Sequence, residues 1–186
     1  MVTSFRNALR NPDVKILVMC EGPNELAVFN VLLDNSMLGF SRSDLLGLTA
    51  YHARQIRLSK QVQLALNMFP GRVLVIRVGD KLNEALPIPM VYREKIIGVY
   101  KCCTKPELEM LLIIAEDLRH EYEKSGMTPK QFAKAHIKLG RRKYDNSTQF
   151  YVDYFSPAPK KLQTAIVEYK RIKRHAGDEL FLADLM

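Results

Sequence analysis

Several sequence patterns that would point directly to a function are missing from this chain. No apolar run approaches the roughly 20 residues that a membrane-spanning helix needs, so we expect no membrane partner. There is also no glycine-rich dinucleotide motif, no P-loop lysine motif and no nucleophile elbow. Walker-type nucleotide hydrolysis and serine hydrolysis are therefore poor explanations of what the chain does.

Cysteine is scarce, and its placement argues against disulfides and zinc. Cys20, Cys102 and Cys103 make an odd count, and none belongs to a Cys-x-x-Cys pair. We expect reduced thiols that pack as small hydrophobic side chains. The first eleven residues lack an apolar stretch followed by small residues, so we expect no secretory signal and a cytoplasmic protein.

What the chain does have is enough apolar content for one domain and an excess of positive charge. It has 186 residues, of which 47% are hydrophobic, and a formal net charge of +8. Ten Lys or Arg lie between Lys138 and Arg174, against three acids. This excess favours a polyanionic partner such as nucleic acid, although a solvated helix face would have the same composition.

Hydrophobic periodicity predicts strands that alternate with helices, which is typical of an α/β fold with a mostly parallel central sheet. The expected strands are Lys15–Cys20, Asp44–Tyr51, Arg72–Val78 and Ile96–Cys102, with Phe150–Phe155 as a strand or bridging loop. The expected helices are Asn24–Asp34, Leu58–Phe69, Pro106–Lys124, Thr128–Ile137 and Pro159–His175.

These elements suggest a lead-in over residues 1–13, a core over 14–125 and a basic helical extension over 126–186 that packs on the core. The last eight residues, Glu179–Met186, are acidic and apolar, unlike the basic helix before them. We expect them to pack back on the chain's own core, with docking on a partner subunit as the alternative.

Two acids follow apolar strands directly. Glu21 comes after the run Ile16–Cys20, and Asp80 comes after the strand Arg72–Val78. The carboxyl ends of parallel strands are where open α/β sheets place their ligands, so neighbouring strands would bring both acids to one crevice. Carboxylates held together suit Mg²⁺ or Mn²⁺, which can activate a water for phosphodiester cleavage. Each acid also has a purely structural explanation. Glu21 could be an acid that favours a helix N-terminus, and Asp80 could be a turn residue.

Two further acids could join them. Glu25 opens a helix, where acids are common, and could serve as a second ligand or a base. Glu107 fits a capping box with Thr104, which leaves Glu109 as the freer acid and a candidate metal ligand or surface glutamate.

The turn Cys20-Glu21-Gly22-Pro23-Asn24-Glu25 resembles the Glu-Gly-x-x-Glu motif of Toprim-type nuclease domains. It is most similar to the small versions in RloB-like and overcoming-lysogenization-type defence proteins. There, an Asp-x-Asp motif ends a later strand and another acid follows on a helix; Asp80 and Glu109 take these places. The resemblance covers roughly residues 14–118 and implies a Toprim-like fold and metal-dependent cleavage of nucleic acid, with Glu21, Glu25 and Asp80 as catalytic residues.

The match departs from the family pattern at one point. Neither Val78 nor Leu82 supplies the second acid of the Asp-x-Asp pair, which puts a two-metal mechanism in doubt. Our first hypothesis is an Mg²⁺- or Mn²⁺-dependent nuclease, possibly in bacterial or phage defence, with Glu21, Asp80 and Glu109 as metal ligands. The alternative is a catalytically inactive Toprim-like module that binds nucleic acid, a protein partner or a second copy of itself.

Basic residues could hold the phosphate backbone of the substrate, and aromatic residues beside them could stack on bases. The candidates for nucleic-acid binding are Arg54, Arg57, Arg141, Arg142, Lys143, Lys170 and Arg171, with Tyr144 and Tyr151 as possible stacking surfaces. For the residues at the end of the last predicted helix, a favourable contact with the helix dipole is the competing explanation.

Overall fold

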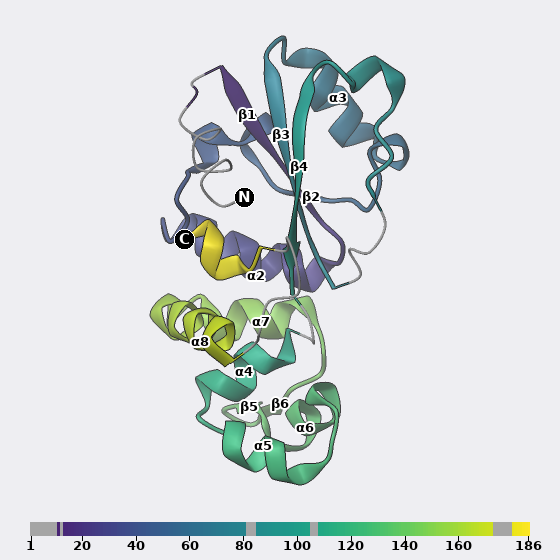
Figure 1. The fold of residues 1–186 in the computed structure, drawn as a ribbon. Coiled ribbons are helices and arrows are strands. Elements are labelled where there is room, and N and C mark those ends of the chain that lie inside the picture. The colour runs from purple at the N-terminus through teal and green to yellow at the C-terminus, as the bar shows by residue number, and fades with distance from the viewer. Residues whose placement is uncertain (1–10, 12, 81–84, 105–107, 173–179) are drawn as a thin grey trace.

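The centre of the molecule, in this computed structural model, is a parallel sheet flanked by helices (Figure 1). The structure describes residues 11, 13–80, 85–104, 108–172 and 180–186. Within these residues the sheet has four strands, in the order β2–β1–β3–β4. Their bounds are β1 Val14–Cys20, β2 Tyr51–His52, β3 Arg72–Gly79 and β4 Ile96–Cys103. The predicted α/β class with a parallel sheet is confirmed.

The two strands that carry the strand-end acids are neighbours. β1 and β3 pair in parallel from Val14 opposite Arg72 to Cys20 opposite Val78. The backbone N–H of Glu21 then donates to the carbonyl of Val78 at 2.8 Å, which extends the pairing by one residue. Glu21 and Asp80 therefore leave the same edge of the sheet, as the sequence predicts.

The described residues also form seven α-helices. They are α2 Pro23–Asp34, α3 Lys60–Met68, α4 Glu109–Ala115, α5 Arg119–Ser125, α6 Pro129–His136, α7 Thr148–Phe155 and α8 Pro159–Ile172. The Thr128 side chain accepts the N–H of Gln131 at 3.3 Å and so caps the predicted helix α6. The last residues of the predicted helix Pro159–His175 lie outside the described residues.

Alternate side chains of the strands enter two separate apolar layers, as the two-residue period of a strand requires. Leu17 and Val75 pack with Val62 and Leu66 of α3 on one face. The opposite face packs against α2 and the C-terminal residues; its buried side chains include Ile16, Val18, Phe29, Leu32, Leu74, Ile76, Leu180 and Leu185. Both faces are covered, which accounts for the continuous apolar runs in the strands.

Two predictions of strand are wrong. The segment 44–51 forms short 3₁₀ turns, Arg42–Asp44 and Leu46–Leu48, before β2. Gly47 and Leu48 have φ values of 69° and 60°, which no strand accommodates. The segment Phe150–Phe155 belongs to helix α7.

Helix α7 begins because the Ser147 hydroxyl accepts the N–H of Phe150 at 3.2 Å. Its buried aromatic side chains then recur at helical spacing; they are Phe150, Tyr151, Tyr154 and Phe155.

The long helix predicted over Pro106–Lys124 is broken. It forms α4 and α5, and its first two residues lie outside the described residues. At the break, Leu118 N–H donates to Ile113 O at 2.9 Å and Asp117 N–H donates to Ile114 O at 3.0 Å. This is a Schellman ending, in which Asp117 adopts the left-handed conformation (φ 57°) that glycine usually supplies.

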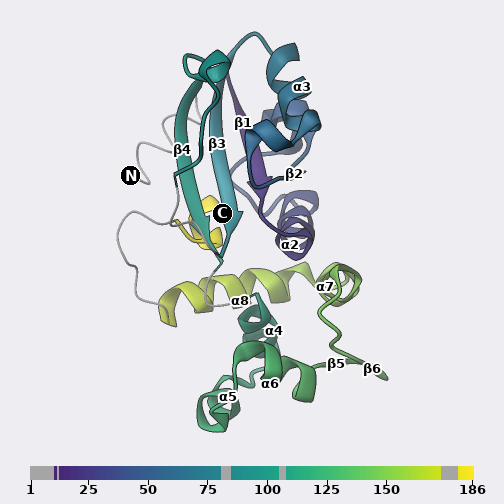
Figure 2. The same cartoon turned by 90° about the vertical axis from the view of Figure 1, so that its right-hand side faces the viewer.

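Helices α4 to α8 gather beyond the carboxyl ends of the strands (Figure 2). Within this group α4 contacts α8, α6 and α5. The helices α4 and α5 belong to the predicted core 14–125 by sequence, but they pack with the helices of the predicted extension. A short hairpin, β5 Lys138–Leu139 and β6 Arg142–Lys143, joins α6 to α7. The edge of the sheet where Glu21 and Asp80 emerge thus faces a helical layer.

The C-terminal residues pack on the chain's own core, as predicted. Leu180 N–H donates to the carbonyl of Lys101 at 2.8 Å, and Cys103 N–H donates to the carbonyl of Leu180 at 2.7 Å. A 3₁₀ turn, Leu182–Leu185, then buries its leucines against the core.

The three cysteines are buried and form no disulfide, which confirms the predicted packing role. Burial raises the pKa of Cys20 and Cys102 far above that of an exposed thiol. None of the described helices is long and apolar enough to cross a membrane.

Candidate functional site

A cavity of about 220 Å³ is lined by residues from the carboxyl edge of the sheet and from the helical layer. Its lining brings together residues from both parts of the chain: Pro23, Asn24, Glu25, Asp80, Thr104, Leu108, Glu109, Lys130, Asn146 and Tyr151. Three of the four acids singled out in the sequence, Glu25, Asp80 and Glu109, therefore line one cavity.

The fourth acid, Glu21, lies beside the cavity rather than in its lining. Its side chain rests against the end of β3, where a Cβ added to Gly79 would be 2.5 Å from Glu21 Oε2. Arg54 lies on the other side, with its Nε 3.7 Å from Glu21 Oε1 and 3.2 Å from the Glu21 carbonyl, to which it donates. The sequence predicts Arg54 as a phosphate-binding residue, and the structure places it next to an acid of the site.

The electrostatics of the site centre on Glu25, in the first turn of α2. Burial raises the pKa of Glu25, a backbone hydrogen bond lowers it, and the negative charges of Asp80, Glu21 and Glu109 raise it further. Asp80, Glu21 and Glu109 are therefore each close enough to Glu25 to disfavour its negative charge. Among the described residues, Glu25, Asp80 and Glu109 have no ion pair with a lysine or arginine.

Glu109 is the most buried acid of the site, with 6% of its surface exposed. It opens helix α4, and its Oε1 accepts a hydrogen bond from the Tyr144 hydroxyl at 2.8 Å. A buried carboxylate without a cationic partner is costly, because its lost hydration is only partly replaced. Glu109 therefore favours a cation in the cavity.

Thr104 supplies a second group that lacks a partner. Thr104 is one of the residues that line the cavity, and its buried hydroxyl oxygen makes no hydrogen bond with the described part of the chain. Its backbone N–H donates to the carbonyl of Gly79 at 3.0 Å, so the residue continues the edge of β4. The sequence suggests Thr104 only as a helix cap with Glu107, and Glu107 lies outside the described residues.

The donors at this edge suit a hard divalent cation, since they are carboxylate oxygens with one free hydroxyl oxygen. Within the described ranges, however, no three acidic, histidine or cysteine side chains already form a group that could hold a metal ion. The predicted ligands Glu21, Asp80 and Glu109 thus lie at one edge of the sheet without a ready-made coordination sphere.

The helical layer contributes residues that the sequence does not assign to the site. Tyr144 and Tyr151 are only 3% and 1% exposed, so neither can stack on a base as predicted. Instead, the Tyr144 hydroxyl contacts Glu109, and Tyr151 lines the cavity with Asn146 and Lys130. No local pattern could have shown this, because the contacts join segments far apart in the chain.

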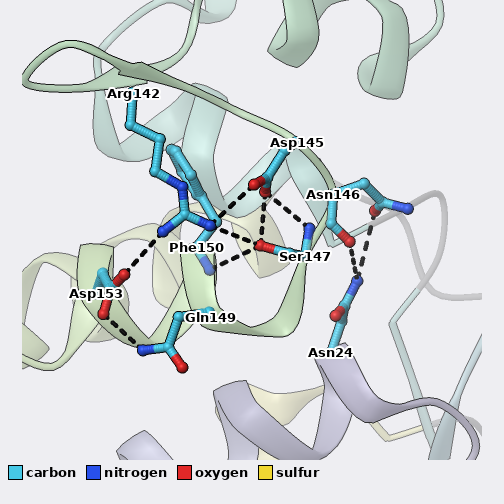
Figure 3. A network of polar contacts seen from close by, with 8 residues as sticks. All are labelled: Asn24, Arg142, Asp145, Asn146, Ser147, Gln149, Phe150 and Asp153. Atoms are coloured by element: carbon cyan, nitrogen blue, oxygen red, sulfur yellow. Dashed lines mark hydrogen bonds and ion pairs between the residues drawn. The ribbon is translucent and has the colours of Figure 1, made fainter.

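Arg142, a predicted nucleic-acid contact, makes several contacts within the fold (Figure 3). Its guanidinium donates to Asp145 and Asp153, each at 2.9 Å, and to the Ser147 hydroxyl at 2.8 Å. It also lies 5.5 Å from the centre of the Phe150 ring. These contacts tie the hairpin to α7, and the pKa of Asp145 falls well below its usual range because Ser147 and Arg142 donate to it.

The other predicted nucleic-acid contacts do not form one continuous surface. Lys170 donates to Asp184 of the C-terminal turn, and Arg171 pairs with Glu168 at 3.2 Å. The end of α8, which carries both, lies on the opposite side of the helical layer from the hairpin β5–β6 (Figure 2). The exposed candidates nearer to the site or on the hairpin are Arg54, Arg57, Arg141 and Lys143.

Glu25→Gln is expected to stabilise the metal-free protein at neutral pH. A carboxyl whose pKa is raised by folding costs stability once the pH exceeds its unfolded pKa, near 4.5, because folding then opposes its ionisation. We expect the melting temperature of Glu25→Gln in EDTA to exceed that of wild type by a few degrees at pH 7.5, and to equal it near pH 4. The exposed Glu94→Gln is the control, and a lower melting temperature for Glu25→Gln at pH 7.5 would contradict the acid cluster.

No protein-family model matches this chain, and neither the curated proteins nor the solved structures contain a significant match to it.

Proposed function

We propose that the chain is an Mg²⁺- or Mn²⁺-dependent nuclease that hydrolyses phosphodiester bonds of DNA or RNA in the cytoplasm. The observation that carries the proposal is that Glu25, Asp80 and Glu109 line one cavity beside Glu21, and that among the described residues these three acids form no ion pair. The Toprim-like motif around Glu21 and Glu25 points to the same chemistry, and by resemblance to a role in bacterial or phage defence.

In the proposed reaction, Glu21, Asp80 and Glu109 would hold the metal ion, with the Thr104 hydroxyl beside them. The bound ion would polarise the phosphate and lower the pKa of a water. Glu25 lines the cavity, and its raised pKa favours it as the base that accepts the proton of the attacking water. Lys130 lines the same cavity and is positioned to contact an anionic substrate.

The substrate backbone would be held outside the cavity by exposed basic residues. Arg54 and Arg57 follow β2, and Arg54 lies beside Glu21, while Arg141 and Lys143 lie on the hairpin. Contacts of this kind are electrostatic and carry no sequence information, so they support binding to nucleic acid in general.

Metal titration tests the proposal directly. We expect calorimetry to show Mn²⁺ uptake by the full chain, and we expect Glu21→Gln and Glu109→Gln to weaken it at least about tenfold, since each removes a charged ligand. Cleavage would be assayed on single- and double-stranded DNA and RNA with Mn²⁺, Mg²⁺ or EDTA. The nuclease would be excluded if Glu21→Gln did not change Mn²⁺ uptake, or no uptake occurred, and no substrate were cleaved.

A second candidate function is an inactive module that binds a protein partner or another copy of the chain. The missing second acid near Asp80 favours it, as does an apolar groove of about 810 Å³ between α3 and the segment before β2. Leu48, Leu64 and Met68 line this groove and are 62%, 60% and 76% exposed. The same titration separates the two functions, because such a module has no use for a metal at Glu21.

A further inference from the structure

The hydroxyl of Tyr144 connects the helical layer to the acids of the sheet. It lies 2.8 Å from Glu109 Oε1, 2.9 Å from the Tyr151 hydroxyl and 2.9 Å from Asn146 Oδ1. All three neighbours are polar, and Tyr144, Tyr151 and Glu109 are each at least nine-tenths buried. A buried polar network of this kind can rigidify the site that it lines.

The phenol of Tyr144 has a single proton, which it can donate to only one of these neighbours. The carboxylate of Glu109 is the strongest acceptor among them, so the proton points to Glu109. Tyr151 can then donate to the oxygen of Tyr144; burial, and next the negative charge of Glu109, raise the pKa of Tyr151 and keep its proton in place. The direction of the chain is therefore Tyr151 to Tyr144 to Glu109.

The surrounding side chains fix the Tyr144 ring. Phe150 and Tyr151 pack edge-on against it, with ring centres 5.2 Å and 5.8 Å away. Two residues further along the chain, Asn146 has a φ of 60°, and the Asn24 amide of α2 donates to its carbonyl at 3.3 Å (Figure 3). The Tyr144 segment is thus held from α2 on one side and from α7 on the other.

We propose that Tyr144, supported by Tyr151, is a positioning residue for Glu109. Its hydrogen bond holds Oε1 and leaves the second carboxylate oxygen for a ligand in the cavity. Groups that orient a metal ligand in this way typically contribute 10- to 100-fold to metal affinity. The inference rests on the proposed metal-dependent function, and it makes the helical layer part of the site rather than only a cover for the sheet.

The test is Mn²⁺ calorimetry on full-length Tyr144→Phe, with Tyr154→Phe as the matched control. Tyr154 is also a buried tyrosine whose hydroxyl donates to a glutamate, Glu116, but that acid lies outside the cavity. We expect Tyr144→Phe to weaken Mn²⁺ binding about tenfold or more and Tyr154→Phe to leave it unchanged. Both variants keep the aromatic ring and its packing, so we expect both to fold. Their melting temperatures will check this.

A double variant separates positioning from general loosening of the fold. If Tyr144 acts through Glu109, adding Tyr144→Phe to Glu109→Gln will cause no further loss of affinity.

Equal Mn²⁺ affinity in Tyr144→Phe and Tyr154→Phe, with Glu109→Gln weakened, would overturn this inference alone. A wild-type chain that binds no Mn²⁺ would overturn the proposed function and the inference with it. Should Tyr144→Phe fail to fold, Tyr151→Phe tests the same chain, with a smaller loss expected.

Discussion

Asp80→Asn is expected to reduce metal-dependent cleavage at least about 100-fold while the protein stays folded. A catalytic metal ion contributes several kcal/mol to the transition state, and each 1.36 kcal/mol is a factor of ten in rate. Asparagine keeps the size of the side chain but removes the charge that would bind the ion. No described lysine or arginine pairs with Asp80, so its replacement breaks no ion pair within the described ranges.

The measurement is single-turnover cleavage in Mg²⁺ or Mn²⁺, accompanied by thermal melting in EDTA. The matched control is Asp117→Asn, an exposed aspartate at the break between α4 and α5 whose left-handed backbone asparagine tolerates. Glu21→Ala should lose cleavage in the same way as Asp80→Asn. Undiminished cleavage in both Asp80→Asn and Glu21→Ala would remove the proposed mechanism.

Removal of residues 180–186 is expected to prevent stable folding. The segment buries Leu180, Phe181, Leu182 and Leu185, each no more than 6% exposed. At about 1.5–3 kcal/mol for each side chain, the loss is about 6–12 kcal/mol. That is comparable to the whole stability of a typical domain, about 5–15 kcal/mol. The truncation also removes the hydrogen bonds that Leu180 makes with the edge of β4.

Solubility after expression and circular dichroism will show the outcome. Deletion of Met186 alone is the control, since the Leu185 carbonyl still accepts the Gly39 N–H, a bond 2.7 Å long in the intact protein. We expect this shorter deletion to fold with only a small loss of stability. A soluble, monomeric and cooperatively melting chain without residues 180–186 would instead favour the alternative in which this segment docks on a partner.

The sheet and its acidic edge could be predicted from the sequence because the patterns that indicate them are local. An apolar run that ends in an acid predicts both the strand and the place of Glu21, and the same holds for Asp80. The misread elements had ambiguous or unusual local chemistry. The aromatic run Phe150–Phe155 fits a strand as well as a helix until Ser147 caps it, and Asp117 takes a backbone conformation that glycine normally marks.

The helical side of the site could not be predicted, because it depends on contacts between distant segments. Tyr144 is 35 residues from Glu109, and Asn146 is 122 residues from Asn24. Beside a basic run, Tyr144 has the composition of a nucleic-acid surface, yet tertiary packing buries it. The sequence therefore places the acids of the site but not the residues that orient them.

Gly79, at the end of β3, is more than a turn residue, because its lack of a side chain affects Glu21. Because the Glu21 side chain occupies the space where a Cβ at Gly79 would stand, the two positions cannot vary independently. A Cβ at position 79 would also lie 2.7 Å from the Cβ of Glu21, so a larger residue there requires the ends of the two strands to move apart. The absence of a side chain at Gly79 thus leaves room for Glu21, the residue that follows β1, to lie beside the cavity.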